Sequence, residues 1–209
     1  MIKKLKTYVM GISRRNKIDY FYSLCGNGSK ILDVGVTSNE HNSEVNLFLN
    51  EFKYADILYT GLAIESMSDI RKKHPNKRFV EYEGRKMPFN DNEFDWVFAN
   101  AVIEHVGGAK EQIIFINEML RVSKNVFFTT PNKYFPVEAH TNTLFRHWNS
   151  QNFYKWCKDN STYWSEKNLV LLSQKDLNGL MIKSHAAKFK IIKNKILYYP
   201  MTFTVVCSK

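Results

Sequence analysis

The chain has 209 residues, 44% of them hydrophobic and 24% charged, a globular composition that excludes a largely disordered protein. No apolar run approaches the ~20 residues of a membrane-spanning helix, and the basic start at residues 1–15 lacks the apolar stretch of a secretory signal. The three cysteines, Cys25, Cys157 and Cys207, show no CxxC spacing, so we expect no disulfide framework, no metal site and a cytoplasmic protein.

The net charge of +10 is concentrated at the two ends of the sequence. Residues 1–18 hold six basic and no acidic residues, and so do residues 177–209, whereas the residues between them hold 18 basic and 20 acidic ones. The simpler interpretation is that lysine-rich edges keep the protein in solution. The alternative is attraction to an anion, such as a membrane surface, a nucleotide-linked or phospholipid-linked substrate, or a nucleic acid.

Residues 1–23 have helical spacing, and we expect them to form a basic lead-in helix before a main domain at residues 24–209. After a turn at residues 25–30, short apolar runs alternate with helical patterns. The predicted strands are residues 31–34, 57–62, 78–81, 94–99 and 125–130. The predicted helices between them are residues 44–53, 66–73 with Ser66 as N-cap, and 109–122. Strands that alternate with helices predict a parallel α/β sheet.

This alternation stops at residues 132–170, which are rich in aromatic residues, His and Asn and show no clear periodicity. Regular signals return with a helix that is capped by Ser173 and ends near Ile182. Two strands at residues 189–192 and 202–207 follow with only a short loop between them. We expect these two strands to form an antiparallel pair at the edge of the sheet.

Ligands of an open α/β sheet bind beyond the carboxyl ends of its strands, where the strand order reverses. Gly35 follows the first predicted strand and would let the backbone approach a ligand closely. Its surroundings do not form GxGxxG, so a pyrophosphate site for NAD is poorly supported. Glu83 follows the third strand and could accept hydrogen bonds from a ribose or an amine. Taken singly, each is better explained as an ordinary turn residue.

Four segments, taken in order and with their spacing, carry more information than either residue alone. They are ILDVGVTS at 31–38, EGRKMPFNDNEFD at 83–95, AVIEHV at 101–106, and LRV at 120–122 leading to TPN at 130–132. With these segments the chain resembles the class I S-adenosylmethionine (SAM)-dependent methyltransferases, within them the bacterial methyltransferase type 11 domains, over most of residues 28–135. The resemblance implies a Rossmann-like, doubly wound, mostly parallel seven-stranded α/β sheet with an antiparallel last strand, and S-adenosyl-L-methionine as cofactor.

The resemblance also implies which residues bind this cofactor. The segment around Asp33 would lie under the methionine part, Glu83 near the adenine, and Asn100 near the sulfonium. The full implied set is Asp33, Val34, Gly35, Thr37, Leu62, Ala63, Glu83, Gly84, Arg85, Asn100, Ala101 and His105.

Two positions depart from the family pattern. The loop after Asp33 keeps one glycine, Gly35, where several are usual. At the end of the second strand, Ala63 replaces the acid that accepts both ribose hydroxyls, and the nearest acid, Glu65, comes two residues later. The departures leave open weak SAM binding, or a non-catalytic binding protein that retains the fold.

The segment at residues 132–170 follows the fifth strand, so we expect it to be an insertion on the substrate side that forms much of the acceptor pocket. An oxygen acceptor often needs a base near neutral pH, and His140 and His147 are the candidates, with Glu138 and Arg146 nearby. Each histidine could instead form hydrogen bonds within a packed loop.

These residues favour methyl transfer to oxygen of a small molecule or of a glycan or lipid-linked sugar, and a phosphate on the acceptor would suit the basic ends. An RNA methyltransferase is the alternative. The sequence Asn100-Ala-Val-Ile103 lacks the Pro-Pro-aromatic pattern that is typical of base methylation, which counts against nucleic acid as the acceptor. Contact of the basic ends with a membrane surface is a further expectation.

Overall fold

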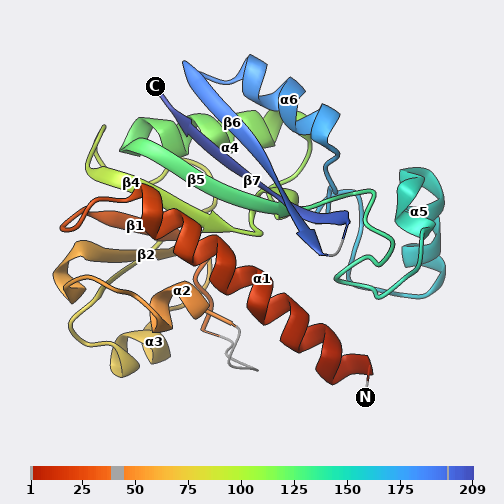
Figure 1. The fold of residues 1–209 in the computed structure, drawn as a ribbon, viewed down its shortest axis with the longest axis horizontal. Coiled ribbons are helices and arrows are strands. Elements are labelled where there is room, and N and C mark those ends of the chain that lie inside the picture. The colour runs from red at the N-terminus through yellow and green to blue at the C-terminus, as the bar shows by residue number, and fades with distance from the viewer. Residues whose placement is uncertain (1, 39–44, 197) are drawn as a thin grey trace.

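The computed structural model describes residues 2–38, 45–196 and 198–209, with only the backbone of residues 2–9, and within them seven strands form one sheet (Figure 1). The order across the sheet is β3-β2-β1-β4-β5-β7-β6. The strands are β1 (Ile31–Val34), β2 (Tyr59–Ala63), β3 (Arg78–Glu81), β4 (Phe94–Asn100), β5 (Ser123–Pro131), β6 (Lys188–Ile196) and β7 (Tyr199–Ser208).

The direction of the strands confirms the predicted fold class. Strands β1 to β5 pair in parallel, and β7 runs antiparallel to both of its neighbours, β5 and β6. The two closing strands are the antiparallel pair that the sequence predicts, with β6 at the edge. The strand order reverses between β1 and β4, so the carboxyl ends of these two strands mark the point where doubly wound sheets bind ligands.

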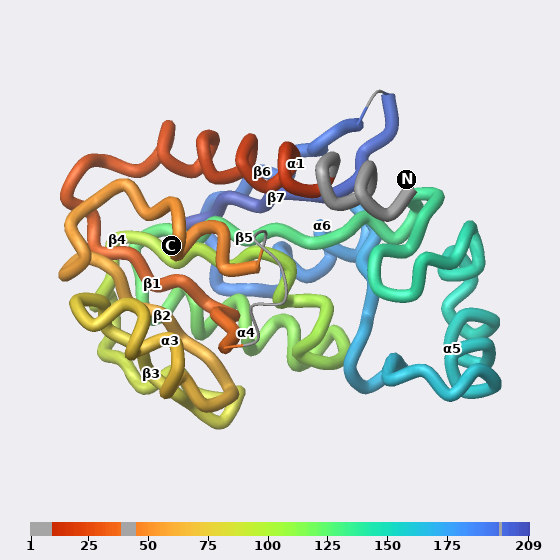
Figure 2. Tube along the Cα trace, turned by 90° about the horizontal axis from the view of Figure 1, so that it is seen from below, coloured from red at the N-terminus to blue at the C-terminus, as the bar shows by residue number. Residues whose placement is uncertain are grey.

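Helices cover both faces of this sheet. They are α1 (Ile2–Leu24), α2 (Leu47–Asn50), α3 (Ser68–Lys73), α4 (Ala109–Val122), α5 (Ser150–Asp159) and α6 (Gln174–Lys183), with 3-10 turns η1 (Asp56–Leu58), η2 (Ile103–His105) and η3 (Arg146–Trp148). Figure 2 shows α1 on one side of the sheet and α4 on the other. Although α1 has 23 residues, neither it nor any other described helix is apolar enough over a sufficient length to span a membrane.

The helix α1 is a packed layer, because its apolar residues enter the core against the sheet. Phe21 is completely buried, and its ring lies 5.2–5.5 Å from those of Trp96, Phe98 and Phe127. The intervening strand residues, such as Val97, face the second core cluster under α4 and α6. This alternation along β4 is what a strand buried on both faces requires.

Three of the predicted elements differ from the structure. The helix predicted at residues 44–53 is limited to α2, residues 47–50, although residue 44 lies outside the described residues. Ser66 does not cap α3: its N-cap is Met67, whose N–H donates to the Glu81 carboxylate at 2.9 Å. The segment 132–170, interpreted as irregular, contains α5, which Asn149 caps by accepting a hydrogen bond from the Asn152 N–H.

The guanidinium of Arg121 fixes the segment that leads into β4. From the last turn of α4 it donates to the backbone carbonyls of Met87 and Phe89, at 2.9 and 2.8 Å, and to the carboxylates of Glu118 and Asp91. The guanidinium is charged in all of these bonds, and in the two to Glu118 and Asp91 the acceptor is charged as well, so they are stronger than bonds between neutral groups. The turn between β3 and β4 is thereby held against α4.

The helix α6 begins with a reciprocal capping box. Ser173 Oγ accepts a hydrogen bond from the Asp176 N–H at 3.2 Å, and the Asp176 carboxylate accepts one from the Ser173 N–H at 2.9 Å. We expect Ser173→Ala to lower the free energy of unfolding by about 1 kcal/mol, measured by urea denaturation. Ser68→Ala is the matched control, because α3 has no side-chain cap; equal losses in both variants would contradict the prediction.

Candidate active site

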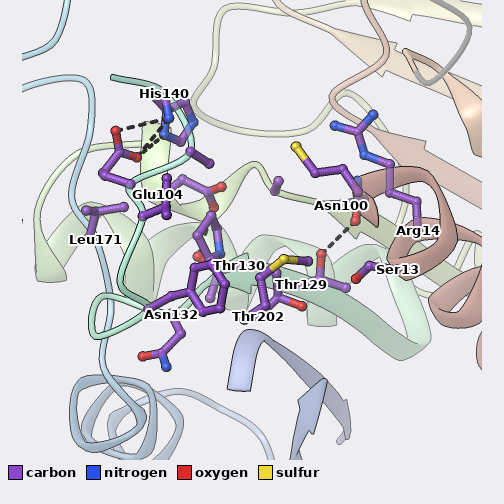
Figure 3. Close-up of a pocket in the computed structure, with 18 of the residues that line it drawn as sticks. Ser13, Arg14, Asn100, Glu104, Thr129, Thr130, Asn132, His140, Leu171 and Thr202 are labelled. Carbon is purple, nitrogen blue, oxygen red and sulfur yellow. Dashed lines mark hydrogen bonds and ion pairs between the residues drawn. The ribbon is translucent and has the colours of Figure 1, made fainter. Parts of the chain in front are cut away.

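Two adjoining cavities lie at the carboxyl ends of the central strands. Figure 3 shows the larger one, with α1 on one side. The larger has a volume of about 770 Å³ and the smaller about 250 Å³. Both are lined by Arg14, Val45, Asn100, Ala101 and His140. A molecule in the smaller cavity would therefore share a boundary with one in the larger.

The bend after β1 forms part of the smaller cavity, which Asp33, Val34, Gly35 and Thr37 all line. Gly35 has a φ of +91°, and a Cβ there would lie 2.4 Å from the Cγ2 atom of Val102. Only glycine meets both demands without strain. The sequence-predicted residues of this bend are thus together in the structure.

Asp33 is a buried carboxyl group beneath this bend. Its Oδ2 accepts a hydrogen bond of 2.6 Å from the Tyr59 hydroxyl. Burial raises the pKa of Asp33 to about 7, against the lowering effect of the bond from Tyr59. Near neutral pH, the charge of this carboxyl group therefore responds to small changes around it.

At the end of β2, the predicted residues Leu62 and Ala63 are buried and line neither cavity. The later acid, Glu65, reaches back to the loop after β1. Its Oε1 accepts hydrogen bonds from the Ser38 N–H at 2.9 Å and from the Thr37 hydroxyl. A carboxylate is thus present beside the bend, two residues beyond the family position.

Glu83, Gly84 and Arg85 form an exposed turn and line neither cavity. A Cβ on Gly84 would lie 3.5 Å from Ile64, so this turn lies against the loop after β2. The structure does not bring these three residues into one cavity with the Asp33 bend. Their contact with adenine stays a prediction.

Strand ends, α1 and the segment 132–170 contribute most of the residues that surround the larger cavity. The strand ends contribute Asn100, Thr129 and Thr130, α1 contributes Met10, Ser13, Arg14 and Lys17, and the insertion contributes Phe135, Val137, Glu138, His140 and His147. Thr129 Oγ1 donates to Asn100 Oδ1 at 2.7 Å, which orients the Asn100 amide at the cavity.

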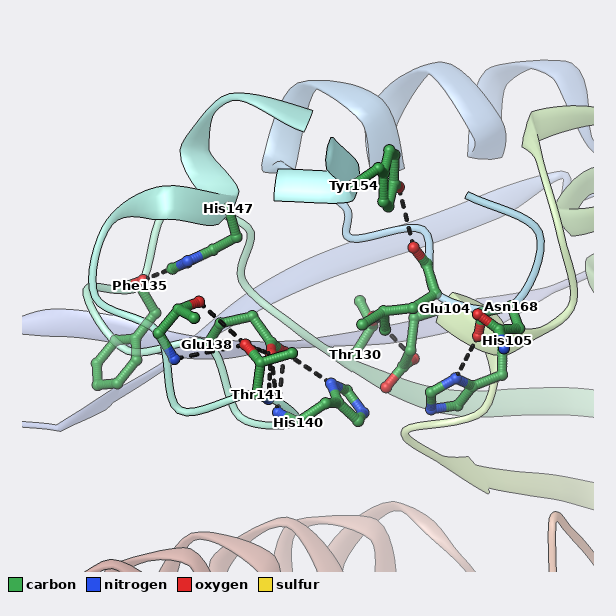
Figure 4. A network of polar contacts seen from close by, with 12 residues as sticks. Glu104, His105, Thr130, Phe135, Glu138, His140, Thr141, His147, Tyr154 and Asn168 are labelled. Atoms are coloured by element: carbon green, nitrogen blue, oxygen red, sulfur yellow. Dashed lines mark hydrogen bonds and ion pairs between the residues drawn. The ribbon is translucent and has the colours of Figure 1, made fainter. Parts of the chain in front are cut away.

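His140 lies at the boundary between the cavities and is held by Glu138 (Figure 4). The Nδ1 atom of His140 lies 2.7 Å from Glu138 Oε1, and its backbone N–H donates to the same carboxylate at 3.0 Å. Burial alone would raise the pKa of Glu138, but hydrogen bonds from His140 and Thr141 hold it at about 2. Glu138 is therefore ionised, and it fixes the orientation of the His140 ring.

His147, the second predicted base, lines the larger cavity but not the smaller one. Its Nε2 lies 2.8 Å from the Phe135 carbonyl oxygen, while its Nδ1 is buried without a partner among the described residues. Burial lowers the pKa of His147 below its ordinary value. The contact with Phe135 ties η3 to the start of the insertion.

Two buried charged residues at this site were not predicted from the sequence. Glu104 lies in η2 and Lys17 in α1, and both line the larger cavity. Burial raises the pKa of Glu104 and lowers that of Lys17 to about 8. The available signal was the position of Lys17 four residues before Phe21 on one helical face, but that pattern alone does not indicate burial.

His105, implied as cofactor-binding, lies beside Glu104 and outside both cavity linings. Its Nδ1 is 2.9 Å from the Asn168 carbonyl oxygen, and its ring stacks on Trp164 at 5.4 Å. The ring centroid of His140 is 5.0 Å away (Figure 4). The turn after β4 and the insertion therefore meet at these two imidazoles.

Residues 32–126 match the family model of the methyltransferase domain. This part of the chain is therefore similar to the methyltransferase domain family. The match indicates a methyltransferase, as the sequence predicts, with S-adenosyl-L-methionine as the expected methyl donor. Comparison of the sequence with curated proteins gives no significant match.

Solved methyltransferase structures share the fold. A SAM-dependent methyltransferase of Methanosarcina mazei is 16% identical, with a TM-score of 0.61 over 91% of this chain and 96% of the other. A Thermotoga maritima enzyme, described as a possible histamine N-methyltransferase, is 15% identical, with 0.60 over 100% and 96%. The magnesium protoporphyrin IX methyltransferase of Synechocystis, with bound S-adenosylhomocysteine, is 10% identical, with 0.59 over 96% and 84%.

The raised pKa of Asp33 predicts a pH-dependent loss of stability. Between about 3.8 and about 7, the folded chain keeps a proton on Asp33 that the unfolded chain has lost. Stability therefore falls as pH rises through this window, by up to about 1.4 kcal/mol per unit. Asp33→Asn has no group that titrates at this position, so its free energy of unfolding should fall less with rising pH. The difference in unfolding free energy, variant minus wild type, should therefore increase from about pH 5 to about pH 7.

Urea denaturation from about pH 5 to about pH 7 measures this difference. Asp69→Asn, at an exposed position of α3, is the control and should follow the wild-type curve. Parallel curves for wild type and Asp33→Asn would show that Asp33 titrates normally in the folded chain.

Proposed function

We propose that this methyltransferase transfers a methyl group to a hydroxyl oxygen of a small-molecule or glycan-type acceptor in the larger cavity. The observation that carries the proposal is the position of His140, which lies at the boundary of the two cavities with its Nδ1 bound to ionised Glu138. A base at that boundary would contact the acceptor where it meets the methyl donor.

The residues at the smaller cavity fit part of S-adenosyl-L-methionine. The Gly35 bend allows close approach of a ligand to the backbone, and Asp33 and Thr37 offer oxygen atoms to its polar groups. Glu65, rather than Ala63, would accept hydrogen bonds from the ribose, since its Oε2 makes none among the described residues. When bound, the sulfonium supplies an electrophilic methyl group.

Residues of the chain would align and deprotonate the acceptor. Because the Nδ1–H of His140 donates to Glu138, its Nε2 carries the lone pair. As the acceptor oxygen forms its bond to the methyl carbon and the carbon–sulfur bond breaks, the hydroxyl proton passes to Nε2. Ionised Glu138 stabilises the resulting imidazolium, and the neutral thioether leaves. His147, whose ring contacts the Phe135 carbonyl, would stabilise the fold of the segment 132–170 instead of acting as a base.

An anionic group on the acceptor would suit the wall that α1 forms. Arg14 and Lys17 lie one helical turn apart and both line the larger cavity. The side chain of Lys17 is buried there, so its charge acts in a medium that screens it weakly. A phosphate-bearing small acceptor fits this pair and the volume of the cavity.

Two alternatives remain testable beside this proposal. A nucleic-acid acceptor is supported by the basic ends alone, and a salt-sensitive shift with RNA would favour it. A non-catalytic role is supported by Ala63, and the absence of any heat with S-adenosylhomocysteine in calorimetry would favour that role.

We expect His140→Gln to reduce kcat by ~10²–10⁴-fold, because general-base catalysis contributes about this much. The assay is mass spectrometry for a methylated product after incubation of acceptor pools with SAM. Affinity for S-adenosylhomocysteine, measured by calorimetry, should change by less than about twofold, since the variant keeps the β1 bend. His185→Gln, at an exposed position, is the control; an unchanged kcat in His140→Gln would rule out the assigned role.

We expect Lys17→Met to raise KM for a phosphorylated acceptor by about tenfold or more, the value of one charge-assisted hydrogen bond. The same acceptor pool after phosphatase treatment should show no such difference between variant and wild type. Lys110→Met, at an exposed position of α4, controls for net charge. Equal KM changes with both pools would contradict recognition of an anion.

A further inference from the structure

Three potential metal ligands meet beside the larger cavity. Glu104, His105 and His140 each offer one ligand atom, and these atoms lie within 4.8 Å of one another. Glu104 and His105 come from η2 directly after β4, whereas His140 comes from the insertion. The fold, not a local sequence motif, brings the three together (Figure 4).

Both imidazoles already have the orientation that metal-binding histidines adopt. The Nδ1 of His105 donates to the Asn168 carbonyl at 2.9 Å, and the Nδ1 of His140 donates to Glu138 at 2.7 Å. In each ring the unprotonated Nε2 is left as the ligand atom. A carbonyl or carboxylate behind the distal nitrogen is the usual outer partner of a metal-bound histidine.

The third group has an unsatisfied oxygen. Glu104 is completely buried, and its Oε2 accepts a hydrogen bond from Thr130 at 3.0 Å, but its Oε1 has no partner among the described residues. Lys17 lines the same cavity, yet no ion pair joins it to Glu104 in the described part of the chain. A buried carboxylate oxygen without a partner is costly, and a bound cation would remove that cost.

The rings are also held in place without an ion. Trp164 stacks on His105 at 5.4 Å and lies edge-on to His140 at 4.7 Å. The side chains therefore need little rearrangement to bind a cation, which lowers the entropy cost of binding.

We propose that Glu104, His105 and His140 bind a divalent transition-metal ion, of which Zn²⁺ is the natural probe. Two imidazoles and one carboxylate suit Zn²⁺, and three protein ligands leave a coordination position for another molecule. Because Glu104 and His140 line the larger cavity, that position is available to an acceptor there. The cysteine spacing had predicted no zinc site, and none of the three proposed ligands is a cysteine.

This inference rests on the proposed function and changes the task of His140. With an ion bound, His140 Nε2 binds the ion instead of accepting a proton. The acceptor hydroxyl loses its proton to solvent on binding the ion, because a divalent cation lowers the pKa of a bound O–H group. The oxygen then forms its bond to the methyl carbon as before.

Titration calorimetry of Zn²⁺ into full-length protein, freed of metal by a chelator, tests the site directly. We expect one ion per chain, and a d–d spectrum typical of low coordination number with Co²⁺. Glu104→Gln and His105→Gln should each weaken Zn²⁺ binding at least tenfold, and Glu138→Gln should weaken it about 10–100-fold as an outer partner. Glu111→Gln, at an exposed position of α4, is the control.

Circular dichroism establishes that each variant is folded, so a loss of binding can be assigned to the missing ligand. Absence of Zn²⁺ binding by wild type, or equal binding by wild type and both ligand variants, would overturn the metal site. Methyl transfer that persists after complete metal removal would overturn the role of the ion in deprotonating the acceptor and leave the proposed function intact. Zn²⁺ binding lost in both ligand variants supports the site even if no hydroxyl acceptor is methylated, a result that would count against the proposed function alone.

Discussion

The register of β1, β4 and β5 decides where the strand-end residues of the two cavities lie. Asp33 pairs with Phe98, and Asn100 pairs with Thr129, so the polar ends of three parallel strands meet at one edge. A slip of one residue would turn the alternating side chains to the opposite face. It would place Phe98 under α4 instead of α1, so the aromatic packing around Phe21 secures the register that positions the site.

Burial of charge is the second physical feature of the site. Glu138 is stabilised by several hydrogen bonds and stays ionised, whereas Glu104 has a hydrogen bond on one oxygen only. Burial acts to raise the pKa of both carboxyl groups, but the hydrogen bonds of Glu138 outweigh it, so the net pKa shifts of Glu138 and Glu104 have opposite directions. Groups with such different environments at one cavity are typical of functional sites.

Local patterns predicted most of the fold. The strands and α4 have strong periodicity and clear boundaries, and Ser173 carries a capping signal that the structure confirms. Ser66 failed as a cap because α3 begins two residues later, after Met67, whose N–H donates to the distant carboxylate of Glu81. Helix α5 was missed although Phe153 and Cys157 lie four residues apart on one helical face, because the helix is short and stands in a segment without other regular signals.

The candidate site was predictable only where topology alone decides position. The Asp33–Thr37 bend and Asn100 meet because parallel strands end together, which the alternation of strands and helices predicts. The meeting of His140 with His105 depends on how the insertion returns to the sheet, and no local pattern records that path. Exposure of Glu83 is likewise a property of its turn in three dimensions.

Along one face of α1, the residues that line the larger cavity differ from the residues that pack against the sheet. Met10, Ser13, Arg14 and Lys17 line the larger cavity, while Ile18 and Phe21 bind the same helix to the sheet. The residues that would meet an acceptor are thus spaced along a single amphipathic stripe whose anchors lie further along the chain. Substitutions at these cavity-lining residues of α1 could therefore change which acceptor is bound without disturbing the packing of the helix on the sheet.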